Sequence, residues 1–267
     1  MSKALDGPLS SGQRVAVIIP ARNEADRIAA TVRVCRAIPL VDLMVVVDDG
    51  STDGTQHAAR AAGAVTVRHS VNRGKASAME TGSKVVAMRD PVDGPGRLLL
   101  FIDADLGESA ANCAPLVQAV LEGEADCAIA ALPPQQDAGG HGFVTGLARR
   151  AIQRITGWTP TQPLSGQRCL THEAFFSVLP LAGGWGVETG MTIDLLLQGY
   201  TVQEVPCDLE HRATKNNFRG YLHRLGQYRD VWLAVQGRRF FRTGVKMRKP
   251  KRRIEHNPGD PYSMSVL

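Results

Sequence analysis

Short apolar segments alternate with segments of helical spacing along most of the chain. The apolar segments are rich in Val, Ile and Leu and are bounded by Gly, Pro or Asp, which is typical of buried strands. We expect strands at 15–19, 43–47, 65–67, 98–102, 127–131 and 201–205. Between them, the spacing of apolar residues predicts helices at 24–37, 52–62, 75–88, 110–121, 147–155 and 192–197.

This alternation predicts an α/β domain with a mostly parallel sheet and helices on both faces. The segment 133–142 (PPQQDAGGHG) interrupts the alternation and predicts a mobile loop. After residue 219, large apolar residues recur at three- and four-residue spacing, which indicates an amphipathic helix. We therefore divide the chain into a flexible N-terminus (1–13), an α/β domain (14–216), a C-terminal amphipathic helix (217–243) and a basic, disordered tail (244–267).

The charge of the chain is concentrated near its C-terminus. The 267 residues carry a net charge of +5, but residues 238–253 alone contain nine Lys and Arg and no acid, so the rest is net acidic. Trp232, Phe240 and Phe241 accompany these cations, which predicts a helix lying on an anionic membrane surface. The same segment would also suit packing on the α/β domain or a solubilising tail. Nucleic acid is a less favoured partner, because the segment does not have the repeated aromatic and basic pattern of a nucleic-acid reader.

Cysteine usage and the N-terminus indicate the compartment. The five cysteines are odd in number and widely spaced, without a C-x-x-C pair, which favours reduced thiols over disulfides or a zinc site. The chain begins without the apolar core of a signal peptide, and no apolar run approaches the ~18 residues of a membrane span. We expect a cytoplasmic protein that associates peripherally with the inner face of the membrane.

Acidic residues follow three of the predicted strands. Glu24 comes after the first strand, Asp48 and Asp49 after the second, and Asp103 and Asp105 after the fourth. The carboxyl ends of parallel strands meet at one edge of the sheet, where open α/β folds bind ligands. Each acidic turn alone would also serve as a tight turn and helix cap. Together they predict a site for Mg²⁺ or Mn²⁺ held against a substrate diphosphate.

The segment Asn72-Arg73-Gly74-Lys75 opens the third predicted helix with two cations. Cations are unfavourable at a helix N-terminus, whose dipole prefers anions. Their presence is explained if a diphosphate binds there, and otherwise they belong to a solvated surface.

These motifs, in this order, resemble a known family. PARNE (20–24), VVDDGSTDGT (46–55), NRGKASAM (72–79) and FIDADL (101–106), followed by LSGQR (164–168) and GWGVE (184–188), are similar to family 2 glycosyltransferases of the GT-A fold. Within that family, the chain resembles both dolichyl-phosphate mannose synthases and glucosyl-3-phosphoglycerate synthases over about residues 14–235. The resemblance implies a Rossmann-like nucleotide-sugar-binding sheet, a UDP- or GDP-sugar donor and Mg²⁺ or Mn²⁺.

The resemblance also implies roles for individual residues. Contacts to the nucleotide sugar would come from Pro20, Ala21, Arg22, Glu24, Asp48, Asp49, Arg73, Gly74, Lys75, Asp103, Ala104 and Arg212. The sugar and acceptor side would be lined by Gly166, Gln167, Glu188 and Lys215. The metal ligands would be Asp105, His211 and Asp103. If the acceptor is a hydroxyl that must lose a proton, Glu188 and Asp194 are the candidate catalytic carboxylates.

The chain departs from the family pattern at two places. Gly107 stands where many dolichyl-phosphate mannose synthases have a metal-binding Gln, which makes His211 more necessary. Glu188 is followed by Thr189-Gly190 instead of the Glu-Asp pair common among inverting members, which puts a catalytic-base role in doubt.

The sequence leaves the acceptor open among a polyprenyl phosphate, an acid similar to 3-phosphoglycerate and a nucleoside-sugar. A non-catalytic nucleotide-sugar-binding protein and a sugar nucleotidyltransferase are the alternative functions. The second would need a Gly-rich, Arg-containing loop where this chain has PARNE. The oligomeric state is also open, a homodimer included.

Overall fold

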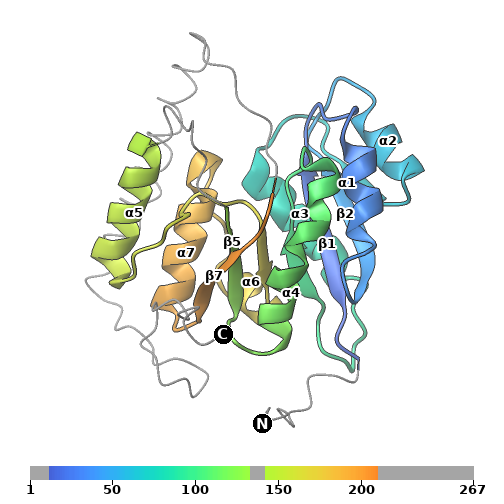
Figure 1. Cartoon of the computed structure of the whole chain (residues 1–267). Coiled ribbons are helices and arrows are strands. Elements are labelled where there is room, and N and C mark those ends of the chain that lie inside the picture. Colours follow the sequence, from blue (N-terminus) through green and yellow to red (C-terminus); the bar gives the residue numbers. More distant parts are fainter. Residues whose placement is uncertain (1–11, 133–141, 210–267) are drawn as a thin grey trace.

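A computed structural model describes residues 12–132 and 142–209, and every structural statement below refers to these residues. They form a seven-stranded sheet with helices on both faces (Figure 1). The strands are β1 (Val15–Ala21), β2 (Val41–Asp48), β3 (Val65–Arg68), β4 (Leu98–Phe101), β5 (Cys127–Ala131), β6 (Arg168–Leu170) and β7 (Val202–Pro206). The α-helices are α1 (Ile28–Cys35), α2 (Thr55–Ala61), α3 (Lys75–Ala87), α4 (Ala114–Leu121), α5 (Gly142–Thr156), α6 (His172–Ser177) and α7 (Val187–Leu197). Two 3₁₀ helices, η1 (Gly107–Cys113) and η2 (Gly184–Gly186), precede α4 and α7.

The order of strands in the sheet is β3-β2-β1-β4-β6-β5-β7. Strand β6 runs antiparallel to both of its neighbours, β4 and β5, and the other pairs are parallel. After β1 the chain adds β2 and β3 on one side, and β4 then returns to the other side of β1. This reversal places a topological switch point at the carboxyl ends of β1 and β4, where open α/β sheets bind their ligands.

The alternation of side chains along each strand divides the core into two layers. In β1, Ala16 and Ile18 face the layer that contains α3, α5, α6 and α7. Val15, Val17 and Ile19 face the layer that contains α1, α2, η1 and α4. Both faces of the sheet are therefore buried, which explains why β1, β4 and β5 are apolar without interruption.

Figure 1 shows α5 beside α7 at one end of the sheet and α1 beside α2 at the other.

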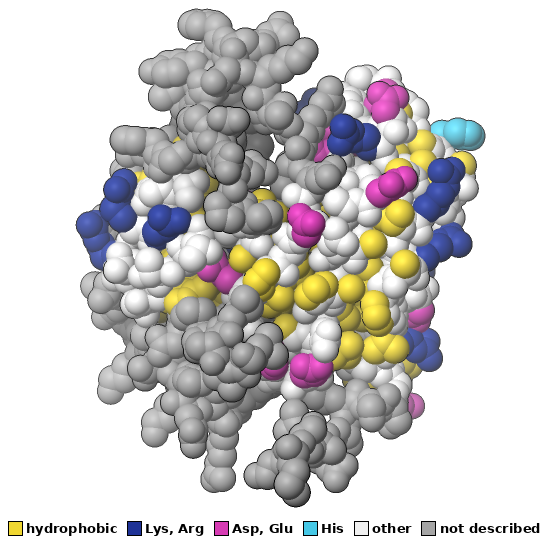
Figure 2. All heavy atoms as spheres, in the orientation of Figure 1, with side chains coloured by type: hydrophobic (Ala, Val, Ile, Leu, Met, Phe, Trp, Pro, Cys, Tyr) yellow, Lys and Arg dark blue, Asp and Glu magenta, His cyan; other side chains and the backbone are white. Residues whose placement is uncertain are grey.

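The surface carries mixed charge. On the face drawn in Figure 2, basic side chains gather over α5, whose exposed residues include Arg150 and Arg154, and acidic side chains lie between this group and the basic ones at the opposite side. No helix among the described residues has both the length and the apolar character that a membrane crossing requires.

The expected α/β class and all six expected strands are confirmed, whereas several helix bounds differ. The first helix begins at Ile28 instead of residue 24, because Asn23 takes a positive φ of 56° and the next residues form a turn. The helix expected at 110–121 divides into η1 and α4, and the helices expected at 147–155 and 192–197 begin earlier, at Gly142 and Val187. Strand β6 and helix α6 were not expected, because three residues beginning with an Arg carry no strand pattern. Residues 133–141 of the expected loop and the whole segment 210–267 lie outside the described residues.

Candidate functional site

The loops that follow β1 and β2 are joined into one wall at the carboxyl edge of the sheet. The backbone N–H of Asn23 donates to Ser51 Oγ at 3.0 Å, and Asn23 Oδ1 accepts from the Thr52 N–H at 2.8 Å. The backbone N–H of Glu24 donates to Thr55 Oγ1 at 2.9 Å. The positive φ of Asn23 turns its amide toward the second loop, so the PARNE and DDGST motifs form a single surface.

Asp49 attaches the start of α3 to this wall. Its carboxylate accepts the backbone N–H groups of Arg73 and Gly74 at 2.8 and 2.7 Å. It also lies 2.8 Å from His69 Nδ1, and the other ring nitrogen of His69 lies 3.0 Å from Thr81 Oγ1 on α3. Burial opposes the ionisation of Asp49, but the hydrogen bonds it accepts outweigh burial and hold its pKa below the ordinary value. Asp49 is thus a buried anchor of the α3 N-terminus, and its predicted contact with the nucleoside stays a prediction.

Asp48 has a different local role. It is 1% exposed and accepts the backbone N–H of Ser51 at 2.9 Å, which closes the turn after β2. Its second oxygen lies 3.6 Å from Arg68 Nε. The Arg68 guanidinium also donates to the Ser51 carbonyl at 2.9 Å, so this ion pair stiffens the same turn.

Lys75, the first residue of α3, is the centre of the site. Its Nζ lies 2.7 Å from Asp103 Oδ1 and 3.0 Å from Glu188 Oε1. Burial alone would lower the pKa of Lys75, but the two carboxylates outweigh burial and raise that pKa above its ordinary value. A single cation therefore joins the end of β4 to the start of α7.

Gly166 and Gln167, in the loop before β6, close one side of this cluster, and their predicted place on the acceptor side stays a prediction. Gln167 is 1% exposed, and its Nε2 donates to Asp103 Oδ2 at 2.6 Å. A Cβ added at Gly166 would lie 2.5 Å from Lys75 Nζ and 2.9 Å from Asp103 Oδ2. A larger residue at position 166 would have to displace the ion pair, so glycine keeps the backbone close to it in its present position.

Asp105 lies two residues beyond Asp103 in a loop that the protein holds by its backbone. Buried Thr31 donates to the Ala104 carbonyl at 3.0 Å and accepts the Gly107 N–H at 2.9 Å. Arg27 donates to the Asp105 carbonyl at 3.0 Å. The carboxylate of Asp105 is half-buried and makes no hydrogen bond or ion pair with another described residue.

This donor set suits a hard divalent cation. Asp105 offers carboxylate oxygens, whereas both oxygens of Asp103 are engaged with Lys75 and Gln167. Within 12–132 and 142–209, no three His, Cys, Asp or Glu side chains form a preformed metal cage. Mg²⁺ and Mn²⁺ do not require such a cage, because they bind through one or two carboxylates together with substrate phosphates. The residues present therefore fit a metal that arrives with a diphosphate.

The remaining predicted site residues are dispersed. Pro20 and Ala21 end β1 beneath the wall, and Arg22 and Arg73 are exposed above it. Asp194 lies six residues beyond Glu188 on α7, roughly 9 Å along the axis and on another side of the helix, so it does not join the Lys75 cluster. His211, Arg212 and Lys215 lie outside the described residues.

Reasoning from sequence assigned no role to three residues that shape the site: His69, Thr31 and Arg168, although Arg168 is the last residue of the LSGQR motif. His69 directly follows β3, and a polar residue after a third parallel strand is a signal that could have found it. Thr31 lies within α1, where nothing in the pattern marks it.

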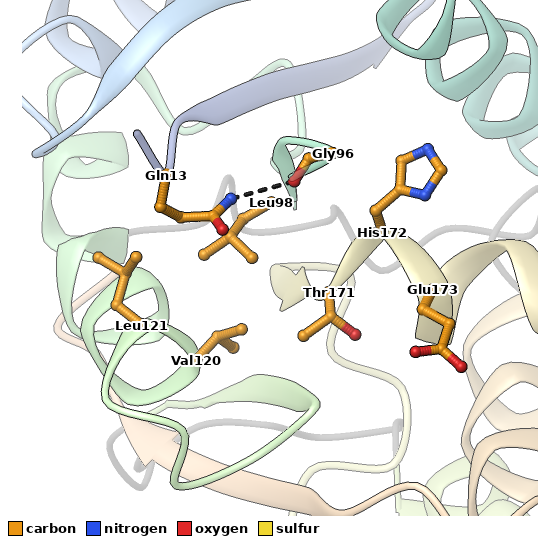
Figure 3. Close-up of a pocket in the computed structure, with 8 residues that line it drawn as sticks. All are labelled: Gln13, Gly96, Leu98, Val120, Leu121, Thr171, His172 and Glu173. Atoms are coloured by element: carbon orange, nitrogen blue, oxygen red, sulfur yellow. Dashed lines mark hydrogen bonds between the residues drawn. The ribbon is translucent and has the colours of Figure 1, made fainter. Parts of the chain in front are cut away.

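A pocket of about 250 Å³ lies at the opposite edge of the sheet (Figure 3). Its wall combines Leu98 at the start of β4, Val120 and Leu121 at the end of α4, and His172 and Glu173 at the start of α6. It contains none of the residues described above, so we do not identify it with the candidate site.

The sheet has an antiparallel strand beside β4, and the acidic turn Asp103-Ala104-Asp105 lies at the switch point. This arrangement is that of the GT-A nucleotide-sugar-binding folds. Residues 16–178 match the model of Glycosyl transferase family 2. This match spans most of the chain, and the protein belongs to that family.

Individual relatives agree with this assignment. The chain is 30% identical to the glucosyl-3-phosphoglycerate synthase of Mycolicibacterium smegmatis over 199 residues, which cover 69% of this chain and 64% of the relative. It is 28% identical to glycosyltransferase AglJ of Haloferax volcanii over 200 residues, covering 72% and 61%. The chain thus spans less than two thirds of the length of these curated relatives.

Solved structures give the same result. The glucosyl-3-phosphoglycerate synthase of Mycobacterium tuberculosis in complex with Mg²⁺ and UDP superimposes with a TM-score of 0.68 at 28% identity, over 89% of this chain and 82% of the other. Its complex with Mn²⁺, UDP and phosphoglyceric acid gives a TM-score of 0.68 at 29% identity, over 89% and 81%.

Proposed function

We propose that this protein is a glycosyltransferase that moves a sugar from a UDP-sugar to a small anionic acceptor, with Mg²⁺ or Mn²⁺. The observation that carries the proposal is the cluster of Lys75, Asp103, Gln167 and Glu188, which the fold brings from four separate segments to the switch point. Asp105 stands beside this cluster as a carboxylate without a described partner. A turn or helix cap would not require such a convergence.

The donor is supported by the wall formed by the PARNE and DDGST loops and by the solved relative that binds UDP. The wall and the α3 N-terminus are linked through Asp49, so a nucleoside on the wall would place its diphosphate near Lys75 and Arg73. Asp105 would hold the metal, with Asp103 and His211 as the further proposed ligands; each oxygen of Asp103 keeps acceptor capacity beside its bond to Lys75 or Gln167. A divalent cation bound there supplies charge stabilisation for the departing diphosphate.

The chain's own residues contribute the second part of that stabilisation. Lys75 is held by two carboxylates at a fixed point, so its charge needs no rearrangement when negative charge grows on the leaving group. Arg73 is exposed beside it and free to contact a phosphate. Glu188 is 7% exposed and adjoins Lys75, so it can bind a sugar hydroxyl or orient an acceptor at the donor's anomeric carbon.

An anionic acceptor agrees with both the site and the relatives. A phosphate or carboxylate acceptor is already ionised and needs little help from a general base, which fits a site whose Glu188 is held by Lys75. The solved relative binds phosphoglyceric acid in addition to UDP and Mn²⁺. We therefore place 3-phosphoglycerate and similar acids first among the acceptors, followed by a polyprenyl phosphate.

Cytoplasmic location and contact with an anionic membrane through the C-terminal basic segment accompany this proposal as predictions. The segment that carries the second of them lies outside the described residues. Equal vesicle binding by the full chain and a chain ending at Gln236 would contradict it.

A transfer assay tests the function directly. Purified full-length protein is incubated with UDP-glucose or GDP-mannose, Mn²⁺ or Mg²⁺, and either 3-phosphoglycerate or a short polyprenyl phosphate, and released nucleoside diphosphate and glycosylated product are both measured. We expect metal-dependent product from UDP-glucose and 3-phosphoglycerate. Binding of donor without transfer to any acceptor would instead favour a non-catalytic nucleotide-sugar-binding protein.

A further inference from the structure

Arg168 is a fully buried cation that neither the metal nor the donor chemistry accounts for. It lies in β6 with 0% exposure. Its Nε donates to the Ser165 carbonyl at 2.9 Å and its Nη1 donates to Thr192 Oγ1 at 2.8 Å, with a longer contact of 3.5 Å from Nη2 to the Pro163 carbonyl. Among the described residues, no carboxylate lies within ion-pair distance of the guanidinium.

Such a charge is costly to bury. The guanidinium is removed from water, and burial lowers the pKa of Arg168 although the more distant carboxylates of Glu188 and Glu204 oppose this effect. Its direct partners are neutral acceptors, which compensate the loss of hydration only in part. A methionine of similar volume would be expected to fill the same place at lower cost. The reason for an arginine at position 168 must therefore lie in the three groups to which the guanidinium donates.

Those three groups belong to the two segments that close the acceptor side of the site. Pro163 and Ser165 precede Gly166 and Gln167, so their carbonyls fix the loop that presses against Lys75 and Asp103.

The third group is the hydroxyl of Thr192, which lies in α7. The hydroxyl of Thr192 donates to the Glu188 carbonyl at 2.9 Å while it accepts from Arg168. Glu188 is in the first turn of α7, and its carboxylate lies 3.0 Å from Lys75. One planar group thus fixes both the loop at 163–167 and the first turns of α7.

We propose that Arg168 is a positioning residue for the acceptor half of the site: its guanidinium sets the distance between the Gly166–Gln167 loop and Glu188. The proposal rests on the proposed function. Arg168 makes no hydrogen bond to the PARNE and DDGST loops or to the α3 N-terminus, where we place the donor. We therefore predict that the loss of Arg168 affects catalysis more than donor binding. A displacement of about 1 Å at reacting groups can reduce a rate by about 100-fold.

The first test separates kcat from KM in the full-length protein. For Arg168→Met we expect kcat to fall about 10- to 100-fold while KM for the donor changes less than about threefold. Arg168→Lys keeps the charge but not the fork of donors, and we expect an intermediate kcat. Equal kcat for wild type and Arg168→Met, or loss of donor binding as large as the loss of kcat, would overturn the proposal.

Matched variants exclude a merely structural effect. Arg97 is likewise buried, but it pairs with Asp42 and Asp90 at the opposite edge of the sheet, so Arg97→Met should lower the melting temperature and leave kcat and KM unchanged in folded protein. If Arg168→Met does not fold, Thr192→Val removes the link to α7 and Thr192→Ser preserves it. We expect the kcat loss in the first variant only.

Hydrogen exchange provides a readout that does not depend on the reaction. In Arg168→Met or Thr192→Val, the backbone amides of 164–167 and 187–192 should exchange faster, with those of 45–50 unchanged. Unchanged exchange in both segments would refute the positioning role even if the protein transfers no sugar. An inactive wild type with this exchange pattern would refute the proposed function alone.

Discussion

Gly166 lies so close to the Lys75–Asp103 ion pair that adding one methyl group, in Gly166→Ala, should lower activity and leave stability nearly unchanged. In Gly166→Ala, the new Cβ would lie 2.5 Å from Lys75 Nζ, whereas ordinary contacts begin at 3.4 Å. The ammonium group must therefore move by about 1 Å, and a displacement of that size can cost about 100-fold in rate. Because the clashing atoms of Lys75 and Asp103 are the ends of partly exposed side chains that can shift together, the free energy of unfolding should change by less than about 1 kcal/mol.

The assay is the transfer reaction at saturating donor, together with urea unfolding of the same samples. Gly82→Ala is the matched control, because its Cβ would lie 2.5 Å from Ile18 Cγ2 in the core and cannot be accommodated by a flexible end. It should lower the free energy of unfolding by about 1–3 kcal/mol. Unchanged kcat in Gly166→Ala, or a loss of stability equal to that of Gly82→Ala, would refute the reasoning.

Two further predictions concern ionisation in the folded protein. The pKa of Asp49 is lowered in the folded state, so its contribution to stability is present above the unfolded pKa of about 3.9 and is lost as pH falls through the lower folded pKa. Urea unfolding between pH 7 and pH 3 should therefore show a weaker loss of stability with acid for Asp49→Asn than for wild type, and parallel curves would contradict this role. Burial raises the pKa of the Cys35, Cys127 and Cys207 thiols to about 12, and those of Cys113 and Cys169 also rise. A thiol reagent at pH 8 should titrate all five cysteines in denaturant and react slowly with the native protein, and rapid native labelling would show that the core opens.

The sheet was predictable because its strands are buried on both faces. Continuous apolar runs such as 98–102 leave no alternative to a central strand, and acidic residues at their ends indicate the ligand-binding edge. Strand β6 was not predictable, because its three residues include Arg168, whose burial depends on Thr192 and on two carbonyls of its own loop. Local pattern carries no information about such partners.

The residues of the site could be predicted from the sequence motifs, but the contacts between them could not all be predicted. The motifs around Lys75, Asp103, Gln167 and Glu188 were identified from the sequence, and the structure brings all four together. The sequence did not show that Asp49 is occupied by the backbone of the Arg73–Gly74 turn and by His69. That contact joins residues from three loops, so only the three-dimensional arrangement shows it.

The central claim is that the carboxyl edge of the sheet binds a nucleotide diphosphate together with a divalent metal. Calorimetric titration of UDP with and without Mn²⁺ tests it most directly, on wild type, Asp105→Asn and the control Asp93→Asn in an exposed loop far from the site. We predict Mn²⁺-dependent binding to wild type and to Asp93→Asn, and binding to Asp105→Asn that Mn²⁺ does not strengthen. Absence of UDP binding to wild type with Mn²⁺ present, or the same metal dependence in Asp105→Asn as in wild type, would contradict the account.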